Sequence, residues 1–527
     1  MEPISKAQLM GEALTEAAAI VPDAAAVIHG NREISFRDLD QAADRVATAL
    51  LNLGVEKGDR VAVLAPNQPE WLFVYFAAAR IGAVVVGLSI RYGQPEITYI
   101  LEQSRAKVVV SIPAYGGMDY ESFFMELSSR LPVQSETFFI GKSSTPGVRA
   151  FDELLSPVPD SARIRNAEAS LEPEDELMLA FTSGTTGRPK GAVLTHKSQL
   201  TASGALARHV RMRTGDIYGV TIPFNHVGGI GCTAIPALLG RAACLLFSGF
   251  SPGEIIRGIA QHKPTIIMGF PTIHTMLLFD ESFPHLDTRS LRLVITGGSA
   301  ASTELVSRLK DAYRCANVMN LYGLTETSGT AAMSAWNSDA ETVARTVGKP
   351  LPGLSVKVVD IADNQLPPDE VGEVCLKGAA VVPGYFRRPE ESRAVFDNAG
   401  WLRTGDMGYL DEEGRLVLLG RKNEMYIQEG YNVYPVEVEE CLASHPKVAM
   451  AAGIGIPDPV MGEVGRYYVV PKPGETVTET ELWELCFRNL SDFKWPKQIV
   501  IRQELPFTST GKVNKSVLRR EFEENGK

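Results

Sequence analysis

Short apolar runs that alternate with helix-like stretches most strongly constrain the fold of this chain. Ser35 precedes a pattern of apolar residues on one helical face, and an apolar strand follows at Val61–Ala65. A second helix-like stretch spans Glu70–Arg80, and strands recur at Thr265–Met268 and Leu291–Thr296. Because strands that alternate with helices pair in parallel, this pattern predicts parallel sheets covered by helices.

The pattern changes after Lys349. Two pairs of strand-like segments follow, each joined by a turn: Leu354–Asp360 with Glu373–Lys377, and Met407–Leu410 with Arg415–Leu419. Segments joined in this way pair antiparallel. We therefore expect hairpins that build a small β-barrel.

Beyond Asn423 the chain is a short mixture of helix and strand patterns. The expected elements are a helix at Pro435–Ser444, strands at Val448–Ile456 and Arg466–Pro471, and a helix at Glu479–Asn489. About a hundred residues are enough for a compact α+β unit. We therefore predict an N-terminal domain over residues 1–422 and a C-terminal domain over residues 423–527.

Composition limits the classes of function that the chain can have. A chain of 527 residues exceeds one core, so two or more domains are expected. The net charge of −11 argues against a nucleic-acid partner, and the apolar run at Ala83–Ile90 falls far short of a membrane span. The six scattered cysteines form no disulfide or zinc pattern, which fits the reducing cytoplasm. The sequence leaves open whether the protein forms a homodimer.

A loop rich in glycine and hydroxyl residues carries the strongest sign of chemistry. It reads Thr182-Ser183-Gly184-Thr185-Thr186-Gly187-Arg188-Pro189-Lys190-Gly191 and follows the apolar strand Glu176–Phe181. Backbone N–H groups and small hydroxyls can surround phosphate oxygens. Pro189 stands where a Walker A loop has its second glycine, so ordinary P-loop transfer of a γ-phosphate is not indicated. The competing interpretation is a flexible surface loop.

Further segments follow in a fixed order along the chain. They are Pro223–Gly229, Gly297–Ser299, Asn320–Glu326, Gly400–Asp406, Gly420–Asn423, Gly430–Pro435 and Thr510–Val513. Together with the loop they resemble the adenylate-forming superfamily of acyl-CoA synthetases, peptide-synthetase adenylation domains and luciferases. The look is closest to fatty-acid or aryl-acid CoA ligases. The resemblance covers most of the chain and implies an α/β fold. Its large N-terminal domain has two parallel-type subdomains and a small β-barrel, and a small α+β C-terminal domain follows.

The resemblance also implies a site for ATP and Mg²⁺. The loop, with Thr182, Ser183, Gly184, Thr185, Thr186, Gly187 and Lys190, would bind the β- and γ-phosphates. Thr182 and Glu326 would be ligands of Mg²⁺, a hard cation that prefers oxygen. Outside this motif, Glu326 would be interpreted as a surface carboxylate.

The adenine would be bound by the next two motifs. The resemblance implies that Tyr322 stacks on the base, while Asn320 and the backbone of Gly298 and Ser299 contact its edge. The same motifs supply the remaining nucleotide-binding residues, Leu321, Gly323 and Thr325. The alternative for Tyr322 is a buried core tyrosine.

Two later motifs would complete the nucleotide site. By the resemblance Asp406 accepts hydrogen bonds from both ribose hydroxyls, with help from Arg421. Lys512 would place its ammonium between the attacking carboxylate and the α-phosphate, where two anions repel each other. The ordinary alternatives are a turn-capping aspartate and a solvated lysine near the chain end.

The acyl group is expected near His226, which in the family often lies between the acyl pocket and the channel for the thiol. The expected lining residues are small or apolar: Phe224, His226, Val227, Gly228, Gly298, Leu321, Thr330 and Ala331. Amino-acid-activating relatives typically carry an aspartate where this chain has Asn225. An unpaired ammonium in a buried site is costly, so we expect an acid without an amino group.

The resemblance assigns two further roles. Gly430, with Tyr431, would lie along the pantetheine arm of coenzyme A. Asn423 stands two positions after the ribose-binding arginine, where the family has the hinge of its mobile C-terminal domain. Relatives usually carry aspartate or lysine there, but asparagine also adopts unusual backbone regions readily. An ordinary loop asparagine is the alternative.

These roles predict an AMP-forming acyl-CoA synthetase that uses ATP, Mg²⁺ and coenzyme A. A medium- or long-chain fatty acid is the expected substrate, and an aryl acid is the alternative. One rival is an acyl-AMP ligase that loads a carrier protein, and another is a catalytically silent nucleotide-binding protein. Lys512 and Glu326 argue against the silent protein, because binding alone needs no lysine at the α-phosphate. A luciferase-like oxygenase is a remote third rival.

Overall fold

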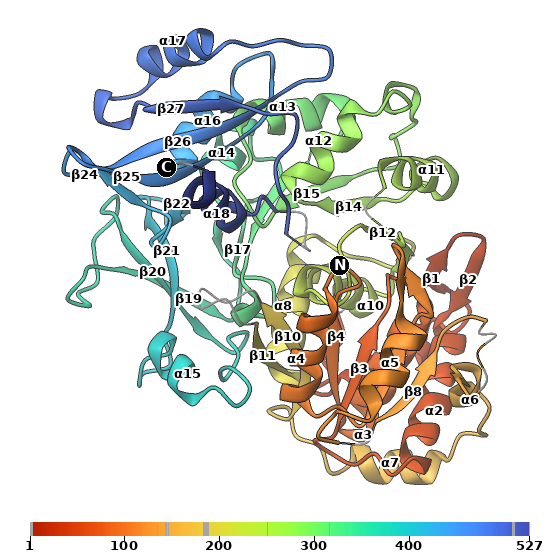
Figure 1. The fold of residues 1–527 in the computed structure, drawn as a ribbon. Coiled ribbons are helices and arrows are strands. Elements are labelled where there is room, and N and C mark those ends of the chain that lie inside the picture. The colour runs from red at the N-terminus through yellow and green to blue at the C-terminus, as the bar shows by residue number, and fades with distance from the viewer. Residues whose placement is uncertain are drawn as a thin grey trace.

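Two large sheets, a four-stranded sheet and a smaller C-terminal unit make up the computed structural model of the protein (Figure 1). It describes residues 4–133, 135–142, 145, 147–182, 189–249, 251–315, 317–508 and 512–525. In Figure 1 the N-terminal elements lie at the lower right and the C-terminal unit lies at the top left.

The first large sheet has seven strands. Their order is β11 (Lys190–Thr195), β10 (Glu176–Thr182), β4 (Val84–Leu88), β3 (Arg60–Leu64), β5 (Val108–Ser111), β8 (Glu136–Phe139) and β9 (Arg149–Ala150). Neighbouring strands pair in parallel from β10 to β9, whereas β11 returns antiparallel to β10. The return from β10 to β11 spans the predicted phosphate loop.

The second large sheet has nine strands. Their order is β18 (Lys349–Pro350), β17 (Ala332–Met333), β16 (Val318–Tyr322), β15 (Leu293–Gly297), β14 (Ile266–Gly269), β12 (Ile217–Val220), β13 (Ala243–Leu246), β1 (Ala25–His29) and β2 (Arg32–Ser35). The six strands from β16 to β1 pair in parallel, and antiparallel strands close both edges. A two-stranded hairpin, β6 (Ala114–Tyr115) with β7 (Met118–Asp119), stands apart.

Helices connect these strands. The longer ones are α1 (Met10–Ile20), α2 (Phe36–Asn52), α3 (Pro69–Ile81), α4 (Gln94–Ser104), α5 (Tyr120–Ser128), α7 (Ser161–Glu168), α8 (His196–His209), α11 (Pro252–His262), α12 (Pro271–Phe279) and α13 (Thr303–Ala312). The short ones are α6 (Asp152–Leu155), α9 (Val227–Gly229), η1 (Ile230–Ala234), α10 (Ile235–Leu239), η2 (Phe283–His285), η3 (Thr325–Thr327), α14 (Ala340–Arg345) and α15 (Pro389–Val395). The parallel α/β expectation is thus confirmed.

Local sequence patterns predict the bounds of several of these elements to within one or two residues. The Ser35 hydroxyl accepts a hydrogen bond from the backbone N–H of Asp38 at 3.1 Å, so Ser35 is the N-cap of α2. The helix predicted at Glu70–Arg80 is α3, which is buried along nearly all its length. The strands predicted at Val61–Ala65 and Leu291–Thr296 are β3 and β15, with ends shifted by one or two residues.

The predicted hairpins form one antiparallel sheet. Its strands pair in the order β19 (Leu354–Val359), β20 (Gly372–Gly378), β21 (Leu402–Leu410) and β22 (Leu416–Arg421). This sheet stands where the small barrel was expected. The register places Asp406 opposite Arg421, so the two residues predicted at the ribose are direct neighbours across the sheet.

The C-terminal unit has its own apolar cores. It contains β23 (Tyr426–Gln428), β24 (Tyr431–Val433), α16 (Pro435–Ala443), β25 (Val448–Asp458), β26 (Gly462–Pro471), α17 (Glu479–Asn489), η4 (Asp492–Lys494), β27 (Gln498–Ile501) and α18 (Lys515–Asn525). Its two clusters of buried residues begin at Tyr426 and Ala452 and draw only on residues after 425. A small α+β domain is confirmed, and the boundary between residues 422 and 423 stays a prediction.

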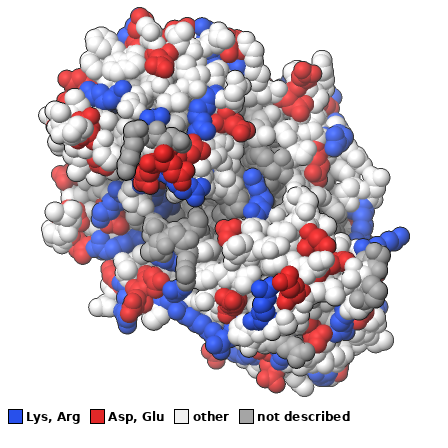
Figure 2. Space-filling view, in the orientation of Figure 1, with Lys and Arg blue, Asp and Glu red and all other residues white. Residues whose placement is uncertain are grey.

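The surface carries charges of both signs. Figure 2 shows acidic and basic side chains interspersed over the visible face. Of the helices in the described ranges, none combines the length and apolarity that crossing a membrane requires.

Candidate active site

Predicted site residues, together with Phe270, which was not predicted, gather where parallel strands end. Phe270, Gly298 and Tyr322 stand at or just after the carboxyl ends of β14, β15 and β16, which are neighbours in the nine-stranded sheet. His226 follows β12, the next strand in the same sheet. Ligands of open α/β sheets bind at this edge, so the strand order alone concentrates the candidate residues there.

The small domain brings Lys512 to this edge. The Lys512 ammonium lies 5.7 Å from the centre of the Phe270 ring, and the same ring meets the His226 ring edge-on at 6.3 Å. A Cβ at Gly298 would lie 3.3 Å from Cε of Lys512, and φ of +78° favours glycine at that position. Lys512 and His226, predicted from separate motifs, therefore share one aromatic neighbour.

Burial sets the charge state of both groups. It lowers the pKa of Lys512 to about 8, with the positive charge of Arg421 adding to the effect. It also lowers the pKa of His226 to about 3, again helped by a neighbouring cation, Lys512. Nδ1 of His226 accepts a hydrogen bond from the N–H of Gly228 at 3.0 Å. The neutral ring thus carries its proton on Nε2 and can donate from there.

The predicted ribose site is assembled from two sheets. Asp406 Oδ2 accepts a hydrogen bond from the Tyr322 hydroxyl at 2.5 Å, and Oδ1 pairs with Arg421 Nε at 2.7 Å. Burial raises the pKa of the Asp406 carboxyl, while Arg421 and then Tyr322 act against the shift. Each carboxylate oxygen has a second lone pair, so Asp406 can still accept hydrogen bonds from a sugar.

Asn320 is fully enclosed. Its side-chain amide donates to the backbone carbonyl of Val343 at 3.2 Å, and its backbone N–H and carbonyl both bond Ser334. None of the described hydrogen bonds uses the side-chain oxygen of Asn320. That oxygen is the acceptor that an adenine amino group needs.

Glu326 has one engaged oxygen. Tyr385 donates its hydroxyl proton to Oε1 of Glu326 at 2.6 Å, whereas no described hydrogen bond or ion pair involves Oε2. Thr182 Oγ1 lies 3.4 Å from the carbonyl of Lys190, at the base of the phosphate loop. One carboxylate and one hydroxyl fit Mg²⁺, which takes few protein oxygens and fills its shell with phosphates and water.

The structure describes only part of the predicted phosphate loop. Ser183, Gly184, Thr185, Thr186 and Gly187 lie outside the described residues, as do Thr510 and Gly511 beside Lys512. Their roles stay predictions.

The predicted acyl residues are mostly buried. Phe224, Val227, Leu321, Thr330 and Ala331 are each less than 4% exposed. Phe224 packs against Trp71 with ring centres 5.4 Å apart. The Phe224–His226 segment also lies against β4, because a Cβ at Gly87 would come within 2.9 Å of the Asn225 Cα.

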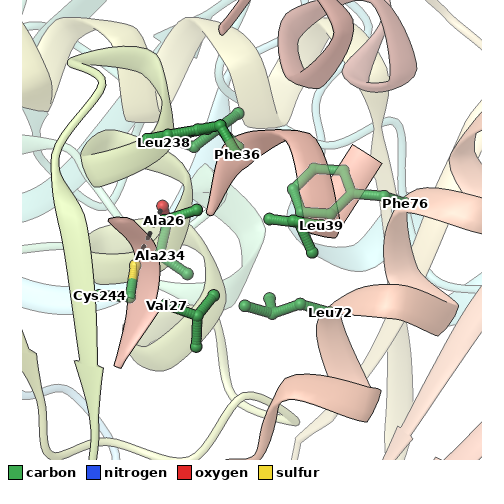
Figure 3. A pocket seen from close by; sticks show the side chains of 9 residues that line it. All are labelled: Ala26, Val27, Phe36, Leu39, Leu72, Phe76, Ala234, Leu238 and Cys244. Carbon is green, nitrogen blue, oxygen red and sulfur yellow. Dashed lines mark hydrogen bonds between the residues drawn. The ribbon is translucent and has the colours of Figure 1, made fainter. Parts of the chain in front are cut away.

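A small cavity lies elsewhere in the core. It measures about 10 Å³ and is lined by Ala26, Val27, Phe36, Leu39, Leu72, Phe76, Ala234, Leu238 and Cys244 (Figure 3). It contains none of the predicted site residues. Its lining is apolar and it has room for about one water molecule, so it is a packing defect and no ligand site.

The predicted coenzyme A residues lie on the outer part of the small domain. Gly430 has φ of +86° in the turn between β23 and β24, and Tyr431 is 57% exposed and stacks on Phe493 at 4.5 Å. In Figure 1, β24 lies on the far side of the small domain from α12 and β14. In this orientation of the small domain Lys512 lies at the strand ends, whereas β24, which follows Gly430 in the chain, lies on the far side.

The sequence profile of the AMP-binding enzyme family matches residues 14–386, and that of its C-terminal domain matches residues 437–512. The chain belongs to the AMP-binding enzyme family. Membership of this family confirms the predicted superfamily. With the CoA ligases among its relatives, it also confirms the predicted enzyme class, an AMP-forming acid–thiol ligase.

Three known proteins illustrate the range of this family. The 3-[(3aS,4S,7aS)-7a-methyl-1,5-dioxo-octahydro-1H-inden-4-yl]propanoyl:CoA ligase of Mycobacterium tuberculosis is 34% identical over 95% of this chain and 96% of its own. The mitochondrial medium-chain acyl-CoA ligase of Rattus norvegicus is 29% identical, over 98% of this chain and 88% of its own. The crystal structure of an anthranilate CoA ligase with anthranoyl-AMP has a TM-score of 0.88 at 27% identity, covering 98% of this chain and 97% of that one.

Sequence reasoning missed Phe270 and Tyr385. Phe270 directly follows β14 in an unremarkable apolar run, and Tyr385 lies in an irregular stretch between β20 and α15. Neither has a local pattern that could have indicated its role, because their contacts join segments distant in sequence.

Proposed function

We propose that this protein activates a medium- or long-chain fatty acid with ATP and transfers the acyl group to coenzyme A. The observation that carries the proposal is the position of Lys512, which reaches Phe270 and Gly298 at the strand ends beside His226. A binding protein has no need of a half-buried ammonium at that place. Free cysteines throughout the chain fit the proposed cytoplasmic location, and a homodimer stays open.

The first half-reaction would join two anions. An oxygen of the substrate carboxylate attacks the α-phosphorus of ATP, and the bond to pyrophosphate breaks, which leaves acyl-AMP. Lys512 would lie between the carboxylate and the α-phosphate, while Asp406 and Arg421 hold the ribose. The His226 Nε2–H would donate to a carboxyl oxygen and orient the acid. Bound at Thr182 and Glu326, Mg²⁺ would neutralise phosphate charge.

The second half-reaction would need a different domain orientation. The sulfur of coenzyme A attacks the acyl carbon, AMP leaves, and the thiol proton is released. In the present orientation Lys512 lies beside Phe270 and His226, where the coenzyme A sulfur would have to approach the acyl carbon. Rotation of the small domain about Asn423 would withdraw Lys512 and bring in Gly430 and Tyr431.

Replacing Glu326 by Gln tests the metal site. We expect Glu326→Gln to raise the Mg²⁺ concentration for half-maximal adenylation more than about 10-fold, because a neutral amide is a poorer ligand for a hard cation. Pyrophosphate release at varied Mg²⁺ measures this. The matched control is Glu341→Gln, a surface residue paired with Arg345. An unchanged rate at limiting Mg²⁺ removes Glu326 from the metal site.

A panel of acids tests the substrate. Fatty and aryl acids should be activated at least about 100-fold better than any α-amino acid, because Asn225 offers no carboxylate to an ammonium and a buried charge without a partner is costly. Pyrophosphate release measured with fatty, aryl, dicarboxylic and amino acids, in the presence and absence of coenzyme A, shows which class of acid the enzyme activates. Strongest release with an amino acid overturns the proposal.

An aryl acid is the second candidate substrate. The anthranilate CoA ligase matches this fold over nearly the whole chain, and the aromatic ring of Phe270 borders the expected acyl site. The same panel separates the two, since an aryl-acid ligase should lose activity with chains of more than about ten carbons that its pocket cannot enclose.

A further inference from the structure

Tyr385 links the two residues that flank the proposed phosphate site. Its hydroxyl donates to Glu326 Oε1 at 2.6 Å, and the Lys190 ammonium lies over its ring at 5.7 Å. An ammonium within about 6 Å of an aromatic centre is attracted to the ring face. One side chain thus contacts both the proposed metal ligand and the lysine that ends the phosphate loop.

The backbone around Tyr385 is held on both sides. On one side it pairs with β11, where Phe386 N–H donates to Gly191 and Val193 N–H donates to Gly384, at 2.8 and 3.0 Å. On the other side, Val382 N–H donates to the carbonyl of Glu326 at 2.9 Å. Residues 382–386 therefore hold the end of the phosphate loop and the η3 turn in a fixed relation.

The hydroxyl itself is kept as a donor. The Tyr385 hydroxyl donates because the Glu326 carboxylate that it contacts at 2.6 Å can only accept a hydrogen bond. The hydrogen bond occupies Oε1, whereas Oε2 takes part in none of the described hydrogen bonds or ion pairs. An oriented carboxylate binds a cation better than one that must give up rotational freedom first.

We propose that Tyr385 is a positioning residue that orients Glu326 for the metal-bound triphosphate and, through its ring, holds Lys190 toward the same phosphates. This inference rests on the proposed function of the site. It adds a residue from the connection between β20 and α15 to a phosphate site whose other residues, Thr182, Lys190 and Glu326, lie on or shortly after strands of the two large sheets.

Two substitutions separate the hydroxyl from the ring. Tyr385→Phe keeps the ring and should weaken Mg²⁺-dependent ATP binding about 10-fold, with little change for ATP in EDTA. Tyr385→Leu should weaken ATP binding under both conditions, because the support of Lys190 is lost too. Calorimetric titration with ATP, with and without Mg²⁺, measures both effects. Tyr120→Phe is the matched control, since it removes a hydroxyl bonded to the Ile90 carbonyl.

A double mutant shows whether the hydroxyl acts through Glu326. If it does, Tyr385→Phe has no further effect on the Mg²⁺ dependence once Glu326→Gln is present. Two results would overturn the role of Tyr385. One is additive effects in the double mutant, and the other is normal Mg²⁺-dependent ATP binding by Tyr385→Phe when Glu326→Gln is impaired. Either result leaves the proposed reaction in place. If the variants show the expected binding pattern but the wild-type protein does not release pyrophosphate with any of the acids, the proposed reaction is refuted. The role of Tyr385 in positioning Glu326 is then still supported.

Discussion

Lys512→Ala is expected to lower acyl-AMP formation about 10²–10³-fold, the range for removing one preorganised charge stabiliser. Thioester formation from supplied acyl-AMP should stay within about threefold of normal, because the two anions meet only in the first half-reaction. Lys512 lies beside Phe270 at the strand ends, where it can act on that encounter. Pyrophosphate release and thioester formation, measured separately, test the split.

A lysine elsewhere in the same domain provides the control. Lys447 pairs with Glu481 on the surface of the small domain, and Lys447→Ala should change neither half-reaction. Equal losses in both half-reactions of a folded Lys512→Ala protein would show that Lys512 does not have the proposed role.

The rate should also depend on pH through Lys512. In the proposed mechanism the free enzyme needs the protonated ammonium, whose pKa is lowered to about 8, so kcat/KM for adenylation should fall as pH rises through that value. His226, with its pKa near 3, is neutral over the whole working range and adds no inflection there. Lys512→Arg should abolish the alkaline fall, because a guanidinium stays charged.

Asn423→Pro is expected to lower overall thioester synthesis about 100-fold while adenylation stays near normal. Proline fixes φ near about −65°, which prevents the backbone rotation that a hinge requires. Asn423 is exposed in a turn where Glu424 and Met425 both donate to the carbonyl of Arg421. None of the described hydrogen bonds uses the Asn423 N–H, so proline removes no bond from the present orientation.

Adenylation is the half-reaction expected to survive because the present orientation already brings Lys512 into the site. The ion pair of Lys472 with Glu304, at 3.7 Å, also spans the two domains in this orientation and would break on rotation. Asn423→Gly is the control, because glycine keeps the backbone free and should support both half-reactions. An Asn423→Pro protein with normal overall activity would place the hinge elsewhere.

Local patterns in the sequence determined the elements and nominated the site. The cap at Ser35 follows from a hydroxyl next to an amphipathic stretch, and it is present, because capping needs only neighbours within three residues. The resemblance to the superfamily nominated Lys512, Asp406 and Glu326, since each stands in a short motif that matches it.

Only the tertiary structure decided what these residues contact. The Tyr322 hydroxyl reaches Asp406 across 84 residues of chain, and that of Tyr385 reaches Glu326 across 59. The lowered pKa of Lys512 likewise comes from burial against a distant domain and from Arg421. Such pairings and charge shifts depend on which distant segments pack together and exclude water, and no period or local motif in a sequence records that.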